Sequence, residues 1–228
     1  MKSPDPSYED LRRKHPEMFV NAPGGIEILL DPVDIEAARR STGSDEPVGV
    51  VYADRFITVV RDAVRFPDGS LGLYVRTLPA GGAPGVVVLP LIGTGSDIVL
   101  VEHYRHATRA WHLEAPRGMG EAGEGGPANA IRELEEELGV RAGELISLGT
   151  VHADSGLLGG HAELYAARIP GVGTLDRAEG IRRAVVMPFS RAEELIGQGD
   201  ITDGFTIAVV TRARLAGLFA KGPDDDTP

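Results

Sequence analysis

The pattern of apolar and polar residues predicts strands in most of the chain after about residue 48. Runs rich in β-branched and apolar residues, bounded by turn residues, predict strands over 55–64, 71–77, 86–92, 98–104, 145–151, 162–168 and 184–187. Apolar residues at helical spacing predict helices over 127–138, 190–198 and 207–219. Strands interleaved with helices are typical of a sheet with helices on its faces, so we predict an α/β fold with a mixed sheet.

The first 45 residues follow a different pattern, which predicts two short helices and little else. The helices are expected over 7–14 and 31–40, with Asp31 as the N-cap of the second. Residues 41–47 have the composition of a loop or linker. The chain is therefore expected to divide into an N-terminal arm over 1–45, a main domain over 46–221 and a disordered acidic tail over 222–228.

Composition narrows the class of protein without naming a function. The 228 residues are 42% hydrophobic and 25% charged, which is typical of a soluble globular protein. The chain shows no apolar run long enough for a membrane span and no secretory signal, so we expect a cytoplasmic protein without a membrane partner. The absence of cysteine excludes disulfides, thiolate metal sites and a cysteine nucleophile. A net charge of −11 argues against nucleic acid as a partner.

A glycine-rich segment over 118–126, followed by the helix predicted over 127–138, contains the candidate chemistry. One face of this helix is apolar, and three carboxylates at i, i+3 and i+4 lie on the other: Glu133, Glu136 and Glu137. Carboxylates this close repel one another unless a cation lies among them. Hard oxygen ligands suit Mg²⁺ or Mn²⁺ better than zinc or copper. Taken alone, such a pattern more often marks a solvated acidic face of a helix than a metal site.

Residues 118–140 resemble the Nudix box, G-x5-E-x7-R-E-U-x-E-E-x-G-U, in which U is an apolar residue. The match holds at every defined position: Gly118, Glu124, Arg132, Glu133, Leu134, Glu136, Glu137, Gly139 and Val140. A complete match argues against a merely solvated helix face. The resemblance implies a Nudix-type α/β/α sandwich and a metal-dependent hydrolase of nucleoside diphosphates linked to a further moiety.

The same resemblance implies roles for the residues of the box. Glu133, Glu136 and Glu137 are expected to be catalytic as ligands of Mg²⁺ or Mn²⁺, together with the backbone carbonyl at Gly118. Glu124 and Arg132 are expected to pair and to brace the loop against the helix. Metal ions in this arrangement neutralise the diphosphate, polarise the phosphorus atom and help to deprotonate the attacking water.

The segments before the box are similar to those of the ADP-ribose pyrophosphatase and nucleotide-sugar branch of the family. That branch often has a Q-Y-R triplet and a W-x-x-E-x-P-A-G lead-in, which resemble His103-Tyr104-Arg105 and residues 111–118. The similarity implies that Arg105 and Glu114 bind the substrate. Arg117 takes the place of an alanine of the branch, and its side chain is expected to reach a phosphate of the substrate. For Arg105 the alternative is an ordinary surface arginine. The branch also implies a small nucleotide substrate, release of a nucleoside monophosphate and a sugar phosphate, and a homodimer.

Three departures from the branch affect the choice of substrate and base. The proline that marks ADP-ribose specificity is missing from residues 154–156, and Arg117 replaces an alanine. The branch's late catalytic glutamate corresponds to Arg177, which leaves Asp176 and Glu179 as neighbouring acids. We predict Glu179 as the general base, the alternative being a solvated loop acid.

Two other functions compete with this prediction. A Nudix-like module that senses a nucleotide without hydrolysing it usually loses glutamates of the box, and this chain keeps all of them. Nudix hydrolases of nucleoside triphosphates or dinucleotides form the other alternative. His103 and His106 fall at a predicted strand end, where we do not expect a metal pair.

Overall fold

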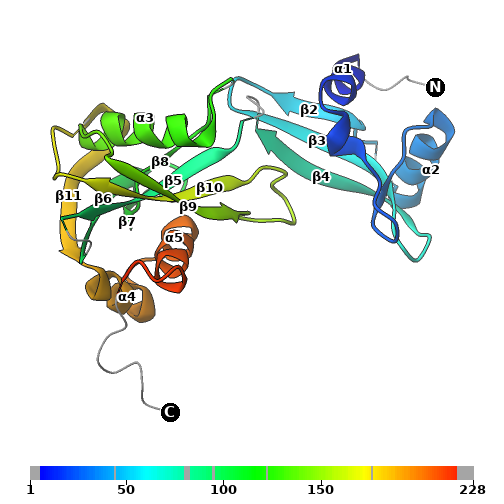
Figure 1. Ribbon diagram of the computed structural model, residues 1–228. Helices are drawn as coiled ribbons and strands as arrows, with labels where there is room; N and C mark the ends of the chain where they lie inside the picture. The colour runs from blue at the N-terminus through cyan, green and yellow to red at the C-terminus, as the bar shows by residue number, and fades with distance from the viewer. Residues whose placement is uncertain are drawn as a thin grey trace, which may run out of the picture. The chain divides into compact units, whose positions relative to one another are not determined.

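The structure is a computed structural model that describes residues 6–43, 45–79, 83–93, 96–121, 123–175 and 177–219 (Figure 1). The chain forms two compact units, one within 1–82 and 154–160, the other within 83–153 and 161–228. The sequence pattern predicts a boundary after residue 45, whereas these units divide the chain near residue 82. The difference arises because the strands between residues 49 and 79 pair in one sheet with a strand of the expected arm. The predicted disordered tail, 222–228, lies outside the described residues.

The first unit is a small antiparallel sheet with short helices. Its elements are α1 (Pro6–Lys14), the 3₁₀ helix η1 (Pro16–Phe19), β1 (Glu27–Ile28), α2 (Pro32–Thr42), β2 (Gly49–Ala53), β3 (Ile57–Arg65) and β4 (Leu71–Pro79). Strand β3 pairs with the other three, all antiparallel. The two helices predicted from the sequence are present within one or two residues of their expected bounds.

Two apolar clusters stabilise this first unit. One joins Tyr8 and Phe19 to Val60 and Leu78, and the other joins the helix α2 to β3 through Ala38 and its neighbours. The buried Tyr8 hydroxyl donates to Asp62 Oδ1 at 2.5 Å, so a polar group in the cluster has a partner. These contacts attach α1 to the sheet.

The second unit contains a mixed sheet and three α-helices. Its strands are β5 (Gly85–Ile92), β6 (Asp97–Arg105), β7 (Ala110–Glu114), β8 (Arg117–Gly118), β9 (Glu144–Val151), β10 (Ala162–Ile169) and β11 (Ile181–Pro188). Its helices are α3 (Gly126–Leu138), α4 (Phe189–Gln198), α5 (Gly204–Leu215) and the 3₁₀ helix η2 (Arg177–Glu179). The strand order is β11-β6-β5-β10-β9, with β7 paired to β6 and β8 paired to β5. Among the described strands of this sheet, only β5 and β10 pair in parallel, which makes the sheet mixed.

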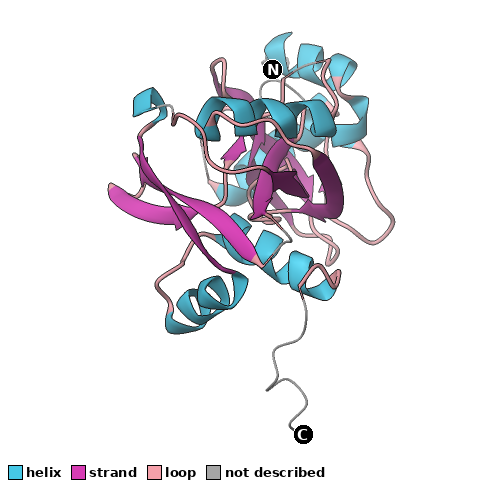
Figure 2. Cartoon of the chain, turned by 60° about the vertical axis from the view of Figure 1, so that its left-hand side comes forward, coloured by secondary structure: helices cyan, strands magenta, loops and turns pink. Residues whose placement is uncertain are grey.

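Helix α3 covers one face of this sheet, and α4 and α5 cover the other (Figures 1 and 2). Alternate residues of β5 belong to the two cores: Val86 and Val88 pack with α3, and Val87 and Leu89 pack with α5. The predicted α/β/α sandwich is therefore confirmed. No helix in the described ranges is long and apolar enough to cross a membrane.

Helix α3 begins and ends where its sequence predicts. Pro127 lies in the first turn, and Gly139 ends the helix in the left-handed conformation at φ +61°. Gly139 is also packed tightly, because a Cβ there would lie 2.4 Å from the carbonyl oxygen of Thr174. A side chain at this position would therefore meet both backbone strain and a steric clash.

Candidate functional site

The carboxylate of Glu133 lies directly against the backbone of Gly118. A Cβ atom at Gly118 would lie 2.1 Å from the carboxylate carbon and from both oxygens of Glu133. Glu133 is only 5% exposed, and its carboxylate lies beside the backbone of β8. Glu133 can therefore occupy this position only when residue 118 is glycine, because any other residue would place a Cβ atom there.

Glu137 is a buried carboxylate that no side chain pairs with. It is 1% exposed, and neither of its oxygens has a side-chain hydrogen bond among the described residues. Burial and the charge of Glu133 together raise the pKa of Glu137 to about 8, against the opposing effects of the Arg117 backbone N–H and the Arg105 charge. Burial likewise raises the pKa of Glu133 to about 7 against the opposing charge of Arg132. Two buried carboxylates this close create a strong preference for a cation beside them.

Glu136 is exposed and turned toward Arg132. The Arg132 guanidinium lies 2.7 Å from Glu136 Oε2 and 2.9 Å from Glu133 Oε1, so it joins two of the predicted ligands. The predicted brace to Glu124 is a long ion pair of 3.9 Å. Arg132 makes a shorter contact to the loop, donating to the carbonyl of Met119 at 3.2 Å.

Asn129 also ties the loop to the helix, and the sequence analysis did not single it out. Its side-chain oxygen accepts from the backbone N–H of Glu121 at 3.2 Å, and the residue is fully buried. A buried asparagine in a helix usually has a structural hydrogen bond, and that was the only signal in the sequence.

The donor set fits a hard divalent cation. The buried carboxylate oxygens of Glu137, which no side chain pairs with, and those of Glu133 are the ligand type that Mg²⁺ prefers. In the described part of the chain, no three Asp, Glu or His side chains are grouped closely enough to bind a metal ion by themselves. The pairing of Glu136 with Arg132 accounts for this, because it directs the third carboxylate to a guanidinium. The three glutamates and the Gly118 carbonyl remain the predicted ligands.

A second cluster of charges joins the three residues predicted to bind substrate. Glu114, 1% exposed, accepts from Arg105 Nε at 2.7 Å and from Arg117 Nε at 3.3 Å through the same carboxylate oxygen. About a quarter of each arginine side chain remains exposed. A buried carboxylate between two guanidiniums orients both of them, and each has further donors free to bind phosphate oxygens.

The beginning of α5 extends this cluster. Asp203 caps the helix by accepting from the N–H of Thr206 at 2.8 Å, and its other oxygen lies 3.3 Å from Arg117 Nη2. Arg117 also lies over the ring of Phe205, with its guanidinium carbon 5.0 Å from the ring centroid. Thus Arg117, which departs from the branch pattern, contacts two residues of the α5 N-terminus.

We expect Thr206→Val to destabilise the protein by about 2 kcal/mol, because it leaves a buried backbone donor without a partner. The Thr206 hydroxyl donates to Asp203 Oδ2 at 2.7 Å and accepts from the N–H of Ala115 at 2.9 Å. Urea denaturation measures the loss, and Thr206→Ser, which keeps the hydroxyl, is the matched control. Equal stability of the valine and serine variants would show that the hydroxyl contributes nothing.

The loop acid Glu179 lies near the buried glutamates. It is an exposed residue of η2, and its charge raises the pKa of both Glu133 and Glu137. Asp176, the other acid considered, lies outside the described residues. Among the described residues of this loop, Glu179 is therefore the acid that acts electrostatically on the glutamates of the box.

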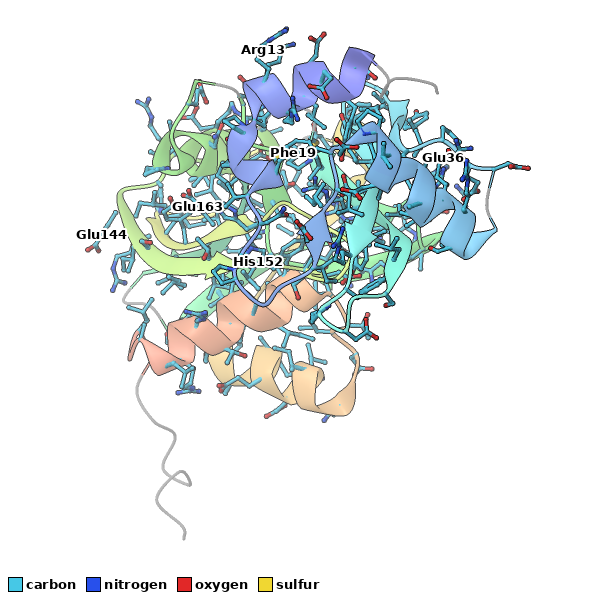
Figure 3. All side chains as sticks on the ribbon, turned by 90° about the vertical axis from the view of Figure 1, so that its right-hand side faces the viewer. Arg13, Phe19, Glu36, Glu144, His152 and Glu163 are labelled. Atoms are coloured by element: carbon cyan, nitrogen blue, oxygen red, sulfur yellow. The ribbon has the colours of Figure 1, made fainter. Side chains whose placement is uncertain are left out.

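Glu163 on β10 supports the N-terminus of α3 (Figure 3). A Cβ at Gly126, the first residue of the helix, would lie 1.8 Å from Glu163 Oε2, and the hydroxyl of Tyr165 donates to the same carboxylate. Negative charge at a helix N-terminus is stabilising. Sequence reasoning missed this contact because residue 163 is far from the box along the chain.

The amino-acid sequence is similar to a known protein family and to two characterised proteins. A family model of the NUDIX domain matches residues 78–195. A CMP-5'-(N-acetyl-N-hydroxy-3-aminopropyl)phosphonate hydrolase of Streptomyces rubellomurinus is 27% identical over 172 residues, which cover 74% of this chain and 81% of that protein. A methanol dehydrogenase activator of Bacillus methanolicus is 27% identical over 172 residues, which cover 72% of this chain and 89% of that protein.

A solved structure supports the fold. The crystal structure of an ADP compounds hydrolase superimposes with a TM-score of 0.60 at 21% identity, covering 73% of this chain and 89% of that one. At this identity the likeness shows the fold alone. The family model, by contrast, matches more than half of the chain. The complete box therefore belongs to a matching domain, and the protein is a member of the Nudix family, a pyrophosphohydrolase that acts on nucleotide-linked substrates.

Proposed function

We propose that the substrate is a nucleoside diphosphate linked to a further moiety, of the ADP-ribose or nucleotide-sugar type. Hydrolysis of its diphosphate bond releases a nucleoside monophosphate and a sugar phosphate. The observation that carries the proposal is the buried carboxylate of Glu137, which no side chain pairs with, together with the partly exposed arginines around Glu114. Together they provide a site for a cation and donors for phosphate oxygens within one unit.

The activities for which two similar proteins are named support a nucleotide with a second group attached as the substrate. The Streptomyces relative is named for hydrolysis of a CMP-linked phosphonate, and the solved structure is that of a hydrolase of ADP compounds. The likeness of residues 103–105 and 111–118 to the ADP-ribose pyrophosphatase branch points to the same class. The same likeness supports a homodimer.

In this proposal the residues of the chain bind and orient the diphosphate. Arg105 and Arg117 donate to its oxygens, and Glu114 keeps both guanidiniums in position. Glu133, Glu136, Glu137 and the Gly118 carbonyl would bind Mg²⁺ or Mn²⁺. When bound, such an ion neutralises phosphate charge and polarises phosphorus.

Glu179 is proposed as the general base. Its carboxylate accepts a proton from the attacking water, an oxygen–phosphorus bond forms, and the bond from phosphorus to the bridging oxygen breaks. Support comes from its exposure and from its electrostatic effect on Glu133 and Glu137.

A panel of substrates tests the proposal. We expect the purified protein with Mg²⁺ to release a nucleoside monophosphate from ADP-ribose, nucleoside-diphosphate sugars or a CMP-linked phosphonate, as measured by separation of the products. Dinucleotides and nucleoside triphosphates complete the panel. Preferred cleavage of triphosphates or dinucleotides would overturn the proposed substrate class while leaving the hydrolase assignment in place.

A further inference from the structure

The two carboxylate oxygens of Asp203 have different partners. Oδ2 accepts from the backbone N–H of Thr206 at 2.8 Å and from its hydroxyl at 2.7 Å, and so caps α5. Oδ1 lies 3.3 Å from Arg117 Nη2 and accepts its hydrogen bond. A helix cap needs only one side-chain oxygen, so the other is available for a second function.

The guanidinium of Arg117 is held from three directions. Its Nε donates to Glu114 Oε2 at 3.3 Å, and its Nη2 donates to Asp203. Its third contact is the half-buried ring of Phe205, whose centroid lies 5.0 Å from the guanidinium carbon. A long side chain with many rotamers loses much of its freedom when it is held in this way. The arginine is therefore oriented before any substrate binds.

These contacts leave part of the Arg117 guanidinium free to bind a ligand. A guanidinium has five N–H donors, and Nε and Nη2 use one each here. Nη1 has no hydrogen-bond partner in the described part of the chain. About a quarter of the side chain is exposed. An arginine that is oriented and still has donors is suited to bind phosphate oxygens.

An acid beside an arginine also competes with phosphate for the same guanidinium, so the charge of Asp203 has to be weighed against its orienting effect. Its carboxylate lies at the N-terminus of α5, where the helix dipole and two donors of Thr206 offset the negative charge. The side chain is only 11% exposed. We therefore expect the orienting effect of Asp203 to exceed its repulsion of a substrate phosphate.

We propose that Asp203 is a positioning residue, which together with Phe205 holds the Arg117 guanidinium in the orientation that binds the diphosphate. This inference rests on the proposed function, in which Arg117 donates to oxygens of the diphosphate. A side chain that is ordered only on binding reduces the affinity, and one that is already ordered in the free protein does not. Asp203 and Phe205 thus act on the substrate through Arg117.

Asparagine in place of Asp203 separates positioning from capping. Asparagine caps a helix about as well as aspartate but has no charge to hold the guanidinium. For the best substrate of the panel, we expect KM to rise by about 10-fold and kcat to stay within about threefold of wild type. Phe205→Leu, which removes the ring but keeps an apolar side chain, should raise KM by about threefold.

Asp31→Asn is the matched control. Asp31 caps α2 by accepting from the N–H of Val33 at 2.7 Å, and it has no arginine partner among the described residues. The control variant should keep the KM of wild type. Thermal unfolding of both asparagine variants shows whether either cap is lost, so a change in KM at equal stability is not a folding effect.

A double-mutant cycle tests whether Asp203 acts through Arg117. Arg117→Ala alone should raise KM by about 10-fold or more, because it removes a charged hydrogen-bond donor. In the Arg117→Ala background, Asp203→Asn should change KM by less than about twofold, because the group that it positions is absent. An equal rise in both backgrounds would overturn the proposal. So would an unchanged or lowered KM in Asp203→Asn, since a lower value is the result expected of an acid that only competes with phosphate.

The outcomes also separate this inference from the proposed function. If wild type cleaves the sugar-linked diphosphates but Arg117→Ala keeps the KM of wild type, the inference fails and the substrate class stands. If wild type cleaves none of them, the substrate class fails. The same cycle, measured as the Kd of ADP by calorimetry in the presence of Mg²⁺, then decides the inference without turnover. A Kd that Asp203→Asn leaves unchanged would overturn it there as well.

Discussion

Glutamine in place of Glu137 is expected to abolish hydrolysis and to stabilise the metal-free protein. An amide keeps the shape of the side chain but removes the charge that would bind the cation. We expect kcat to fall on the order of 10³-fold, as happens when a group that stabilises transition-state charge is removed. Product release from the best substrate of the panel, at saturating Mg²⁺, measures the loss.

The gain in stability follows from the raised pKa of Glu137. Its folded-state pKa is about 8 and its ordinary value is 4.5, with burial as the main cause. An unfolded chain therefore loses this proton near pH 4.5, and the folded protein keeps it until about pH 8. The stability that Glu137 contributes through its proton is therefore present at low pH and is lost as the pH rises from about 4.5 to about 8. Glutamine never ionises, so the variant avoids a cost of up to about 3 kcal/mol at pH 7.

Urea denaturation in the presence of EDTA at pH 5 and pH 7.5 tests this second part. The free energy of unfolding of the Glu137→Gln variant should exceed that of wild type at pH 7.5, and the two values should lie closer together at pH 5. Glu135→Gln is the matched control, because Glu135 lies on the same helix but is exposed and pairs with Arg141. Saturating Mg²⁺ should stabilise wild type and the control but not the Glu137 variant. Equal pH dependence of all three proteins would contradict the prediction.

Alanine at Gly118 should leave the protein folded and nearly inactive. The added Cβ would lie 2.1 Å from the Glu133 carboxylate, and that carboxylate is the end of a flexible side chain. The side chain can move away at little cost to folding, but a predicted ligand is then displaced. Because a shift of about 1 Å costs on the order of 10²-fold in rate, we expect at least that loss in kcat.

Kinetics and thermal unfolding of Gly118→Ala measure the two effects separately. Gly125→Ala is the control in the same loop, since its Cβ would meet only Pro127 Cδ, at an ordinary 3.8 Å. The control should keep most of its activity. Full activity of Gly118→Ala would mean that the contact between Gly118 and Glu133 is not needed for catalysis.

The sequence by itself determined the local parts of this protein. The bounds of α3 follow from Pro127 and Gly139, whose backbone preferences act within one turn of helix. Its apolar stripe follows from the helical period, and the two faces of β5 follow from strand alternation. The box identified the family because its residues lie close together along the chain and their spacing is itself the signal.

Only the tertiary structure decided which distant residues meet. Arg117 and Asp203 are 86 positions apart in sequence, and Thr206 reaches Ala115 across 91. Such pairs leave no local periodic trace, so a single sequence could not have predicted them. The same applies to the contact of Glu163 with the start of α3. It also applies to the short strands β7 and β8, which form by pairing with β6 and β5. The direction of Glu136 toward Arg132 was likewise decided in three dimensions, because helical spacing specifies a face but not the rotamer of a side chain.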